Sequence, residues 1–223
     1  TMLATLHPMR LFAIYTVLER EGESAISRIH EQTGYDPWFL YQLIEQINIE
    51  KRIGSEPLEP ELLLEAKRFG LSDLHIAKLG KTGMLDVERM RSENGIFAVY
   101  HFVDTCAGEF TADTPYFYST YGEADEGGRI EGKAVIVLAS GPNRIGQGLE
   151  FDTCCTLASL AYRNCGVHPI LINSNPETVS TDFNVSDRLY IEPLTPEHVL
   201  EVMRKENVWD VVVQLGGQTP LNM

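Results

Sequence analysis

The sequence predicts an all-α helical domain followed by a small α/β domain with a parallel sheet, of the Rossmann-like kind. Two observations predict this fold class. The first half consists of short amphipathic stretches that begin at capping residues and end at glycines, whereas the second half alternates apolar strands with helices. A polar, glycine-rich stretch at 122–132 separates the two patterns. We therefore expect domains at 1–121 and 133–223, joined by a linker at 122–132.

The first half carries the start and stop signals of six short helices. The clearest start is at Asp36 and Pro37, because aspartate caps the free N–H groups of a first turn and proline suits the first helical position. The apolar stripe of this helix comprises Phe39, Leu40, Leu43, Ile44 and Ile47. The other helices are expected at about 11–18, 23–32, 60–69, 72–79 and 84–93. The aromatic stretch 96–121 lacks a helical period, so we expect extended connecting segments there.

The second half reads as a β-α-β series, which predicts a doubly wound parallel sheet. The run 134–139 is continuously apolar and β-branched, as expected for a strand buried on both faces. The remaining elements are expected as a helix at 150–164, strands at 168–172, 188–191 and 209–214, and a helix at 196–206 that Thr195 caps. Four short strands that end close to Met223 suggest a domain truncated at its C-terminal end.

Composition excludes several classes of function. The net charge is −14 and no basic patch is present, so nucleic acid is not an expected partner. The sequence contains no run of about 18 apolar residues, so no membrane span is predicted. The four cysteines fit neither a disulfide ladder nor a zinc spacing, and no secretory signal is visible, so we expect free thiols in the reducing cytoplasm.

Three polar loops follow predicted strands, at 140–148, 173–182 and 216–220. In an open α/β sheet, ligands collect outside the carboxyl ends of the strands, so we expect these loops to converge on one edge. A solvated, hydrogen-bonded loop without a ligand is the alternative for 173–182.

The first loop is neither a dinucleotide fingerprint nor a Walker loop. Its glycines fall at 141, 146 and 148, so G-x-G-x-x-G is not met, and no Gly-Lys-Ser/Thr is present. The opposite charges of Arg144 and Glu150 fit either the lining of a polar passage or a structural ion pair. The histidines are scattered and form no Ser-His-Asp or Cys-His set, so we assign no catalytic residue and no metal ligand.

Long motifs in register resemble the large, synthetase subunit of carbamoyl phosphate synthetase. The run from Ser140 to Asp152 resembles the signature at the start of that family's second synthetase half. Further similar motifs follow in the family's order at 175–182, 186–193 and 216–220. Upstream, the segments 36–40, 103–110 and 118–121 resemble the family's helical oligomerisation domain.

This resemblance implies an internal fragment that is inactive alone. It implies an oligomerisation domain, followed by the pre-ATP-grasp domain of the half that phosphorylates carbamate. The loops matching Arg144, Gly148, Glu150 and Glu177 line the family's passage for carbamate, where small and charged residues suit a narrow polar conduit. We expect the rest of the loop edge to comprise Asn143, Asn175, Gly216, Gly217 and Gln218.

The resemblance also implies cofactors and partners. The family is an ATP-dependent ligase of arginine and pyrimidine biosynthesis, and the full subunit uses ATP with Mg²⁺ or Mn²⁺. The fragment itself is expected to bind no cofactor. The implied partners are the ATP-grasp modules of the same subunit, a separate or fused glutaminase, and a second copy bound through the helical domain.

Two alternative functions remain open from the sequence. One is a stand-alone oligomerisation or interaction module, which residues 1–121 favour. The other is an NAD-dependent oxidoreductase, which rests only on the strand, glycine-loop and helix pattern and which the absence of G-x-G-x-x-G disfavours.

Overall fold

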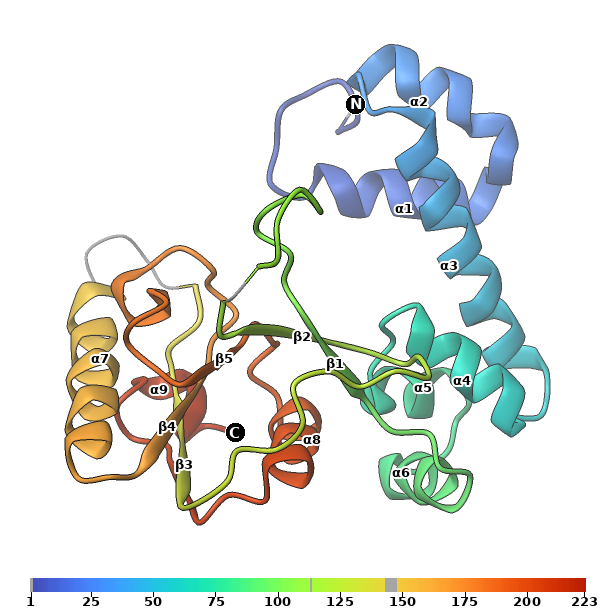
Figure 1. Ribbon diagram of the computed structural model, residues 1–223. Coiled ribbons are helices and arrows are strands. Elements are labelled where there is room, and N and C mark those ends of the chain that lie inside the picture. The colour runs from blue at the N-terminus through green and yellow to red at the C-terminus, as the bar shows by residue number, and fades with distance from the viewer. Residues whose placement is uncertain (1, 113, 143–147) are drawn as a thin grey trace. The chain divides into compact units, whose positions relative to one another are not determined.

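The computed structural model describes residues 2–112, 114–142 and 148–223 and divides the chain into two compact units, Thr1–Ile96 and Phe97–Met223 (Figure 1). The predicted fold class is confirmed, since helices form the first unit and a mostly parallel sheet with helices forms the second. None of the helices in these described ranges is long and apolar enough to cross a membrane.

The described part of the first unit is helical. Its elements are α1 (Arg10–Glu21), the 3-10 turn η1 (Gly22–Ala25), α2 (Ile26–Thr33), α3 (Pro37–Ser55), α4 (Pro60–Arg68), α5 (Asp73–Leu79) and α6 (Met84–Glu93). Capping residues set several of these boundaries as predicted. Asp36 Oδ1 accepts a hydrogen bond from the Trp38 N–H at 2.8 Å, and Ser72 Oγ accepts one from the His75 N–H at 3.2 Å.

The helix α3 contributes to one apolar cluster of this unit, together with α1, η1 and α2. The buried members of that cluster are Leu3, Ile14, Leu18, Ala25, Ile26, Ile29, Leu40, Ile44 and Ile47. One member of the predicted α3 stripe behaves differently, because Phe39 is 56% exposed. The helical spacing of apolar residues predicts the centre of the buried face, but a residue at the edge of that face can be either buried or exposed.

A buried network of charges joins α4, α5 and α6. Asp73 accepts a hydrogen bond from Lys67 Nζ at 3.0 Å and another from Arg91 Nε at 2.8 Å. Lys67 also donates to the Leu71 carbonyl and Arg91 to the Ile96 carbonyl. Each charge is thus paired and hydrogen-bonded, which is the condition under which ionised groups are tolerated inside a protein.

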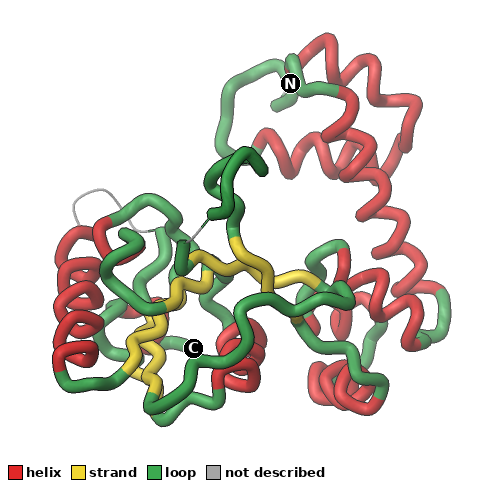
Figure 2. Tube along the Cα trace, viewed as in Figure 1, coloured by secondary structure: helices red, strands yellow, loops and turns green. Residues whose placement is uncertain are grey.

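The second unit is built on a six-stranded sheet with the order β1-β2-β5-β4-β3-β6, drawn in yellow in Figure 2. The strands are β1 (Val99–Phe102), β2 (Tyr116–Thr120), β3 (Ala134–Leu138), β4 (His168–Ile172), β5 (Arg188–Tyr190) and β6 (Asp210–Val212). Neighbouring strands run parallel except β1 and β2, which pair antiparallel. The accompanying helical elements are α7 (Gly148–Asn164), η2 (Val179–Thr181), α8 (Pro196–Glu206) and α9 (Gln218–Leu221).

Two apolar layers cover opposite faces of this sheet, with α7 on one side and α8 on the other (Figure 1). Alternate residues of β3 divide between them. Val137 packs in the layer that contains Cys155 of α7, whereas Ile136 packs in the layer that contains Val202 of α8. The fully apolar run of β3 is therefore explained by burial on both faces, as predicted.

The aromatic stretch 97–121 belongs to the α/β unit, although the sequence analysis placed it with the helical domain. It forms β1 and β2, and β2 pairs with β5, so the sheet has six strands where four were predicted. The aromatic side chains are buried by this sheet. Phe117 stacks on Tyr190 with ring centroids 5.2 Å apart, and Tyr100 meets Tyr190 edge-on at 4.8 Å.

The glycine-rich stretch 122–132 is packed against the α/β unit and is not a free linker. Arg188 donates to the carbonyls of Gly127 and Gly128 and pairs with the buried Glu206. Glu206 in turn accepts from the Ile130 N–H at 3.1 Å. Composition predicted a linker because glycines and acids dominate, but buried charged partners elsewhere in the chain hold the segment in place.

Candidate functional site

Three loops that follow parallel strands meet at one edge of the sheet. β3 lies between β4 and β6, and the register pairs Leu138 with Ile172 and Val137 with Val212. Because these strands are parallel, their carboxyl ends and the loops that follow lie at the same edge. The structure therefore brings together the three loops that the sequence analysis expected to converge.

The loop after β3 approaches its neighbours closely at Gly141. This residue has φ +67°, and a Cβ there would lie 2.9 Å from Ser174 Oγ and 3.3 Å from Leu194 Cδ1. A side chain at Gly141 would thus collide with the loop after β4 and with the segment after β5. Glycine is required here both for its left-handed backbone and for this close approach.

The predicted conduit residues of this loop are only partly described. Gly148 opens α7, and Glu150 is exposed in the first turn of that helix. Asn143 and Arg144 lie outside the described residues. The expected relation between Arg144 and Glu150, whether a polar lining or an ion pair, therefore stays a prediction.

The loop after β4 is shaped by a series of its own hydrogen bonds. The buried Asn173 accepts from the Asn175 N–H at 3.0 Å, and Asn175 accepts from the Glu177 N–H at 3.2 Å. Thr178 and Thr181 then form a reciprocal capping box around η2. These turns fix the backbone that carries the exposed side chain of Glu177.

A buried carboxylate ties this second loop to α7. Asp152 Oδ2 accepts a hydrogen bond from the Ser180 N–H at 3.0 Å, and both residues are buried. Neither residue was predicted from the sequence to have a role in the site. The available signal was spacing, because Asp152 lies three residues before Cys155 and seven before Ser159, on the face that α7 buries.

The loop after β6 is packed onto the other two through its glycines. A Cβ on Gly216 would lie 2.6 Å from the carbonyl oxygens of Leu138 and Ala139. Gly217 has φ +74°, and a Cβ there would meet the Phe151 ring at 2.9 Å. Both predicted loop-edge glycines are thus buried packing residues, and they present no side chain to a ligand.

Polar groups remain exposed along this edge. Glu150, Glu177 and Gln218 are exposed and Asn175 is half-buried. Within the described ranges, no basic side chain forms an ion pair with Glu150 or Glu177. The edge therefore offers carboxylate and amide groups that can hydrogen-bond a small polar molecule.

The thiol of Cys155 lies on the buried face of α7, next to this edge. Burial raises the pKa of the Cys155 thiol to about 12, so this thiol stays protonated at neutral pH. The described parts of the chain hold no group of three or more His, Cys, Asp or Glu residues placed to bind a metal ion.

A further carboxylate at the end of β5 was not singled out from the sequence. Glu192 is 3% exposed, accepts a hydrogen bond from the Ser119 N–H of β2, and lies 3.9 Å from His198 Nε2. Burial raises the pKa of Glu192 above its ordinary value. Its partner Ser119 lies 73 positions away, so only the paired strands bring the two together.

Comparison with known proteins matches both units. Residues 1–95 match the model of the carbamoyl-phosphate synthetase large chain oligomerisation domain, and residues 131–223 match that of the carbamoyl phosphate synthase preATP-grasp domain. The carbamoyl phosphate synthase large chain of Methanothermobacter thermautotrophicus is 48% identical over 96% of this chain. The large chains from Nostoc sp. and Haemophilus ducreyi are 47% and 49% identical over 99% and 89% of it.

The chain belongs to the carbamoyl phosphate synthase large-chain family. It spans about a fifth of the length of these relatives, since the aligned region covers 20% of the first two and 19% of the third. Within the large-chain family, the helical unit thus corresponds to the oligomerisation domain and most of the α/β unit to the preATP-grasp domain. The segment 96–130, which contains β1 and β2, falls between the two matched regions.

Proposed function

We propose that this chain supplies two non-catalytic parts of a carbamoyl phosphate synthase large chain, a wall of the passage for carbamate and a surface for assembly. The whole protein, on this proposal, is an ATP-dependent ligase in the cytoplasm. It makes carbamoyl phosphate from bicarbonate, glutamine-derived ammonia and two ATP molecules. The names of the relatives support the proposed activity.

The observation that carries the conduit role is the convergence of three loops at one edge, with Glu150 and Glu177 exposed on it. The glycines pack the loops together, while the carboxylates and the amide of Gln218 line the edge. Such groups hydrogen-bond a small polar intermediate, and a conduit that excludes bulk water protects it from hydrolysis. Arg144 and Gly148 complete the proposed lining.

The proposal places phosphate chemistry outside this chain. ATP and Mg²⁺ or Mn²⁺ bind the ATP-grasp modules, and a separate or fused glutaminase supplies ammonia. Residues 1–223 alone are therefore expected to show no bicarbonate-stimulated hydrolysis of ATP. Such activity in the purified chain would contradict the non-catalytic role.

The conduit role is tested in the large chain that carries this segment. We expect Glu150→Ala and Glu177→Ala to raise the amount of ATP hydrolysed per carbamoyl phosphate formed, because carbamate escapes or decays before it is phosphorylated. Glu123→Ala, an exposed acid in the stretch before β3, is the matched control. An unchanged ratio in both conduit variants contradicts the proposed lining.

A specific surface favours the second role, self-association. The helical unit has an apolar groove of about 650 Å³, whose lining includes Leu11, Tyr35, Phe39 and Leu43. Beside it, Trp38 and Phe39 form an edge-on pair with ring centroids 5.0 Å apart, and both side chains are more than half exposed. Clustered exposed aromatic residues of this kind mark protein–protein contacts.

We expect Phe39→Ser to weaken self-association of the chain, because it removes an aromatic contact from this surface. Leu85→Ser on α6 is the control, since Leu85 is also well exposed but is not part of the groove lining. Light scattering across a concentration series measures the mass of each variant. A parent chain that stays monomeric at high concentration, or equal effects of the two variants, contradicts this role.

A further inference from the structure

The strand β1 lies at one end of the sheet, and within the described residues no strand pairs with its outer side. In the antiparallel pair with β2, successive residues point their backbone N–H and C=O groups alternately toward the partner and away from it. Val103, one residue beyond β1, donates its N–H to the Tyr116 carbonyl of β2 at 2.9 Å. The even-numbered positions Ala98, Tyr100 and Phe102 therefore direct their backbone groups outward, where an open edge offers them to another strand.

Two neighbouring acids occupy this outer side in place of a strand. Asp125 Oδ1 accepts a hydrogen bond from the Tyr100 N–H at 2.9 Å, and Glu126 Oε2 accepts one from the Phe102 N–H at 2.7 Å. The Glu126 N–H donates in turn to the Tyr100 carbonyl at 2.8 Å. Hydrogen bonds from N–H groups to carboxylates are charge-assisted and therefore stronger than those between neutral groups. The backbone groups that a pairing strand needs are thus already bonded.

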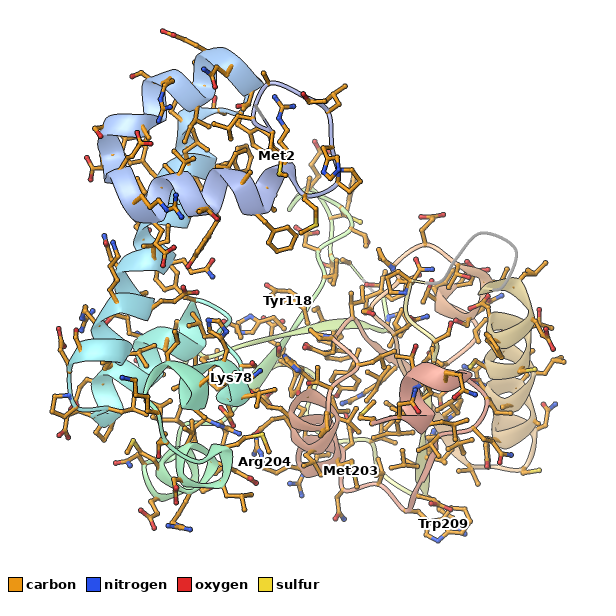
Figure 3. All side chains as sticks on the ribbon, turned by 180° about the vertical axis from the view of Figure 1, so that it is seen from behind. Met2, Lys78, Tyr118, Met203, Arg204 and Trp209 are labelled. Carbon is orange, nitrogen blue, oxygen red and sulfur yellow. The ribbon has the colours of Figure 1, made fainter. Side chains whose placement is uncertain are left out.

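Helix α8 holds the two acids in place with a buried lysine. Lys205 is 7% exposed, forms an ion pair with Asp125, and donates to the Glu126 carbonyl at 3.1 Å. On the same outer side, Arg204 donates to the Ala98 carbonyl at 3.0 Å, and Figure 3 shows Arg204 projecting from α8. The contacts along the outer side of β1 are therefore anchored in the packed part of the α/β unit.

The residue after the two acids fits against the strands only as glycine. Gly127 has φ +74°, and a Cβ there would lie 2.8 Å from Phe117 Cζ and 3.2 Å from Phe102 Cζ. Any side chain at this position would push the segment 125–127 away from β1. The segment is thus packed tightly along the edge that it covers.

We propose that segment 125–127 closes the β1 edge against pairing with β1 of a second copy. An edge strand with free N–H and C=O groups pairs readily with its own copy, and proteins prevent this by placing charged side chains there. The side chains of Phe102 and Tyr118, 38% and 43% exposed on β1 and β2, add apolar surface that favours such pairing. This surface is separate from the groove of the helical unit, so the proposal stands whether or not that groove self-associates.

Amide hydrogen exchange, followed residue by residue by NMR, tests the closed edge in the parent chain. We expect the amides of Tyr100 and Phe102 to exchange as slowly as that of His101, which faces β2, to within about tenfold. An open edge would leave the two outward amides exposed to water. Exchange of both at the rate of an unstructured peptide overturns the proposal.

The double substitution Asp125→Ala and Glu126→Ala tests the consequence of opening the edge. It is made in a Phe39→Ser background, which removes the aromatic contact proposed for self-association of the helical unit. In dilute solution we expect the Tyr100 and Phe102 amides to exchange at least about tenfold faster than in that background alone. At high concentration we expect the mass measured by light scattering to rise and the protection of the two amides to return, because copies pair through β1.

The matched control is Glu123→Ala in the same background, since Glu123 is an exposed acid that does not bond β1. A double variant that stays monomeric at high concentration, or an equal rise in mass in the control, overturns the proposal. Near-ultraviolet circular dichroism reports whether the double variant remains folded. If it does not, Glu126→Ala alone keeps the Asp125–Lys205 pair and frees the Phe102 N–H. An unchanged exchange rate at Phe102, or a mass that does not rise with concentration, then overturns the proposal.

Discussion

At the scale of single residues, buried acids determine how the polar loops of the α/β unit are held. Asp152 connects α7 to the loop after β4, and Glu192 connects the end of β5 to β2. Neither residue belongs to the exposed set that was selected from the sequence. The exposed acids Glu150 and Glu177 are thus presented by a helix and a loop that the buried Asp152 ties together.

Glu192 predicts a specific dependence of stability on pH. Because burial raises its pKa in the folded state, the protonated form is favoured by folding, and this contribution is fully present below the unfolded pKa of about 4.3. The contribution is lost as pH rises through the raised folded pKa. We therefore expect Glu192→Gln, which stays neutral and still accepts from Ser119, to gain stability over the parent as pH rises from about 4 to 8.

Urea midpoints measured at several pH values across this range test the prediction. Glu123→Gln is the control, since Glu123 is an exposed acid. His198 Nε2 lies 3.9 Å from Glu192, so His198→Gln separates the contribution of this neighbour. A constant difference between Glu192→Gln and the parent at every pH contradicts the assigned cause.

The sequence predicted the exposed candidate residues of the site better than the buried residues that hold their loops in place. Asn175 and Glu177 were selected because they follow a strand, and chain order alone places them at the carboxyl edge. Asp152 and Ser180 are 28 positions apart, and the partners Glu192 and Ser119 are 73 apart. Such pairings depend on which strands and helices become neighbours, and a local pattern of residues does not contain that information.

At the scale of elements, local signals predicted the helices and strands well but not their partners. Pro37, Ser72 and Thr195 mark helix starts that the structure confirms, because a cap acts within one turn. The strands β1 and β2 were expected only as extended segments. Their place in the sheet depends on pairing with β5, which follows about 70 residues later.

The charge network of α4, α5 and α6 gives a prediction at this scale. We expect Asp73→Ala to destabilise the helical unit by about 3–5 kcal/mol, because it leaves the buried charges of Lys67 and Arg91 without their shared partner. Urea unfolding followed by Trp38 fluorescence in a Trp209→Phe background measures the change. Asp86→Ala removes an exposed pair with Arg89 and should change stability by less than about 1 kcal/mol. An equal loss of stability in the two variants would contradict the larger contribution assigned to the buried ion pairs.

At the scale of the whole molecule, the structure places the division of the chain at Ile96 and Phe97, earlier than composition suggested. Glycine content located a boundary at 122–132, but this stretch is held by Arg188, Glu206 and Lys205. The aromatic residues of 97–121 are needed to complete the apolar layer beneath α8. A domain boundary follows from where buried contacts cease, and sequence composition is only a correlate of that.

Two shortened chains test this division. We expect residues 97–223 to unfold cooperatively, with far- and near-ultraviolet circular dichroism lost together. Residues 122–223 should lose near-ultraviolet signal and bind a hydrophobic dye, because Tyr190 and Val202 lose the cover of Tyr100 and Phe117. If both pieces fold equally well, β1 and β2 are dispensable, and the division lies where composition placed it.

The boundary between the two units is held from within each unit. Arg91, anchored by Asp73, donates to the Ile96 carbonyl, while Arg204, paired with Glu201, donates to the Ala98 carbonyl. Loss of either guanidinium is therefore expected to fray the chain only on its own side of the boundary.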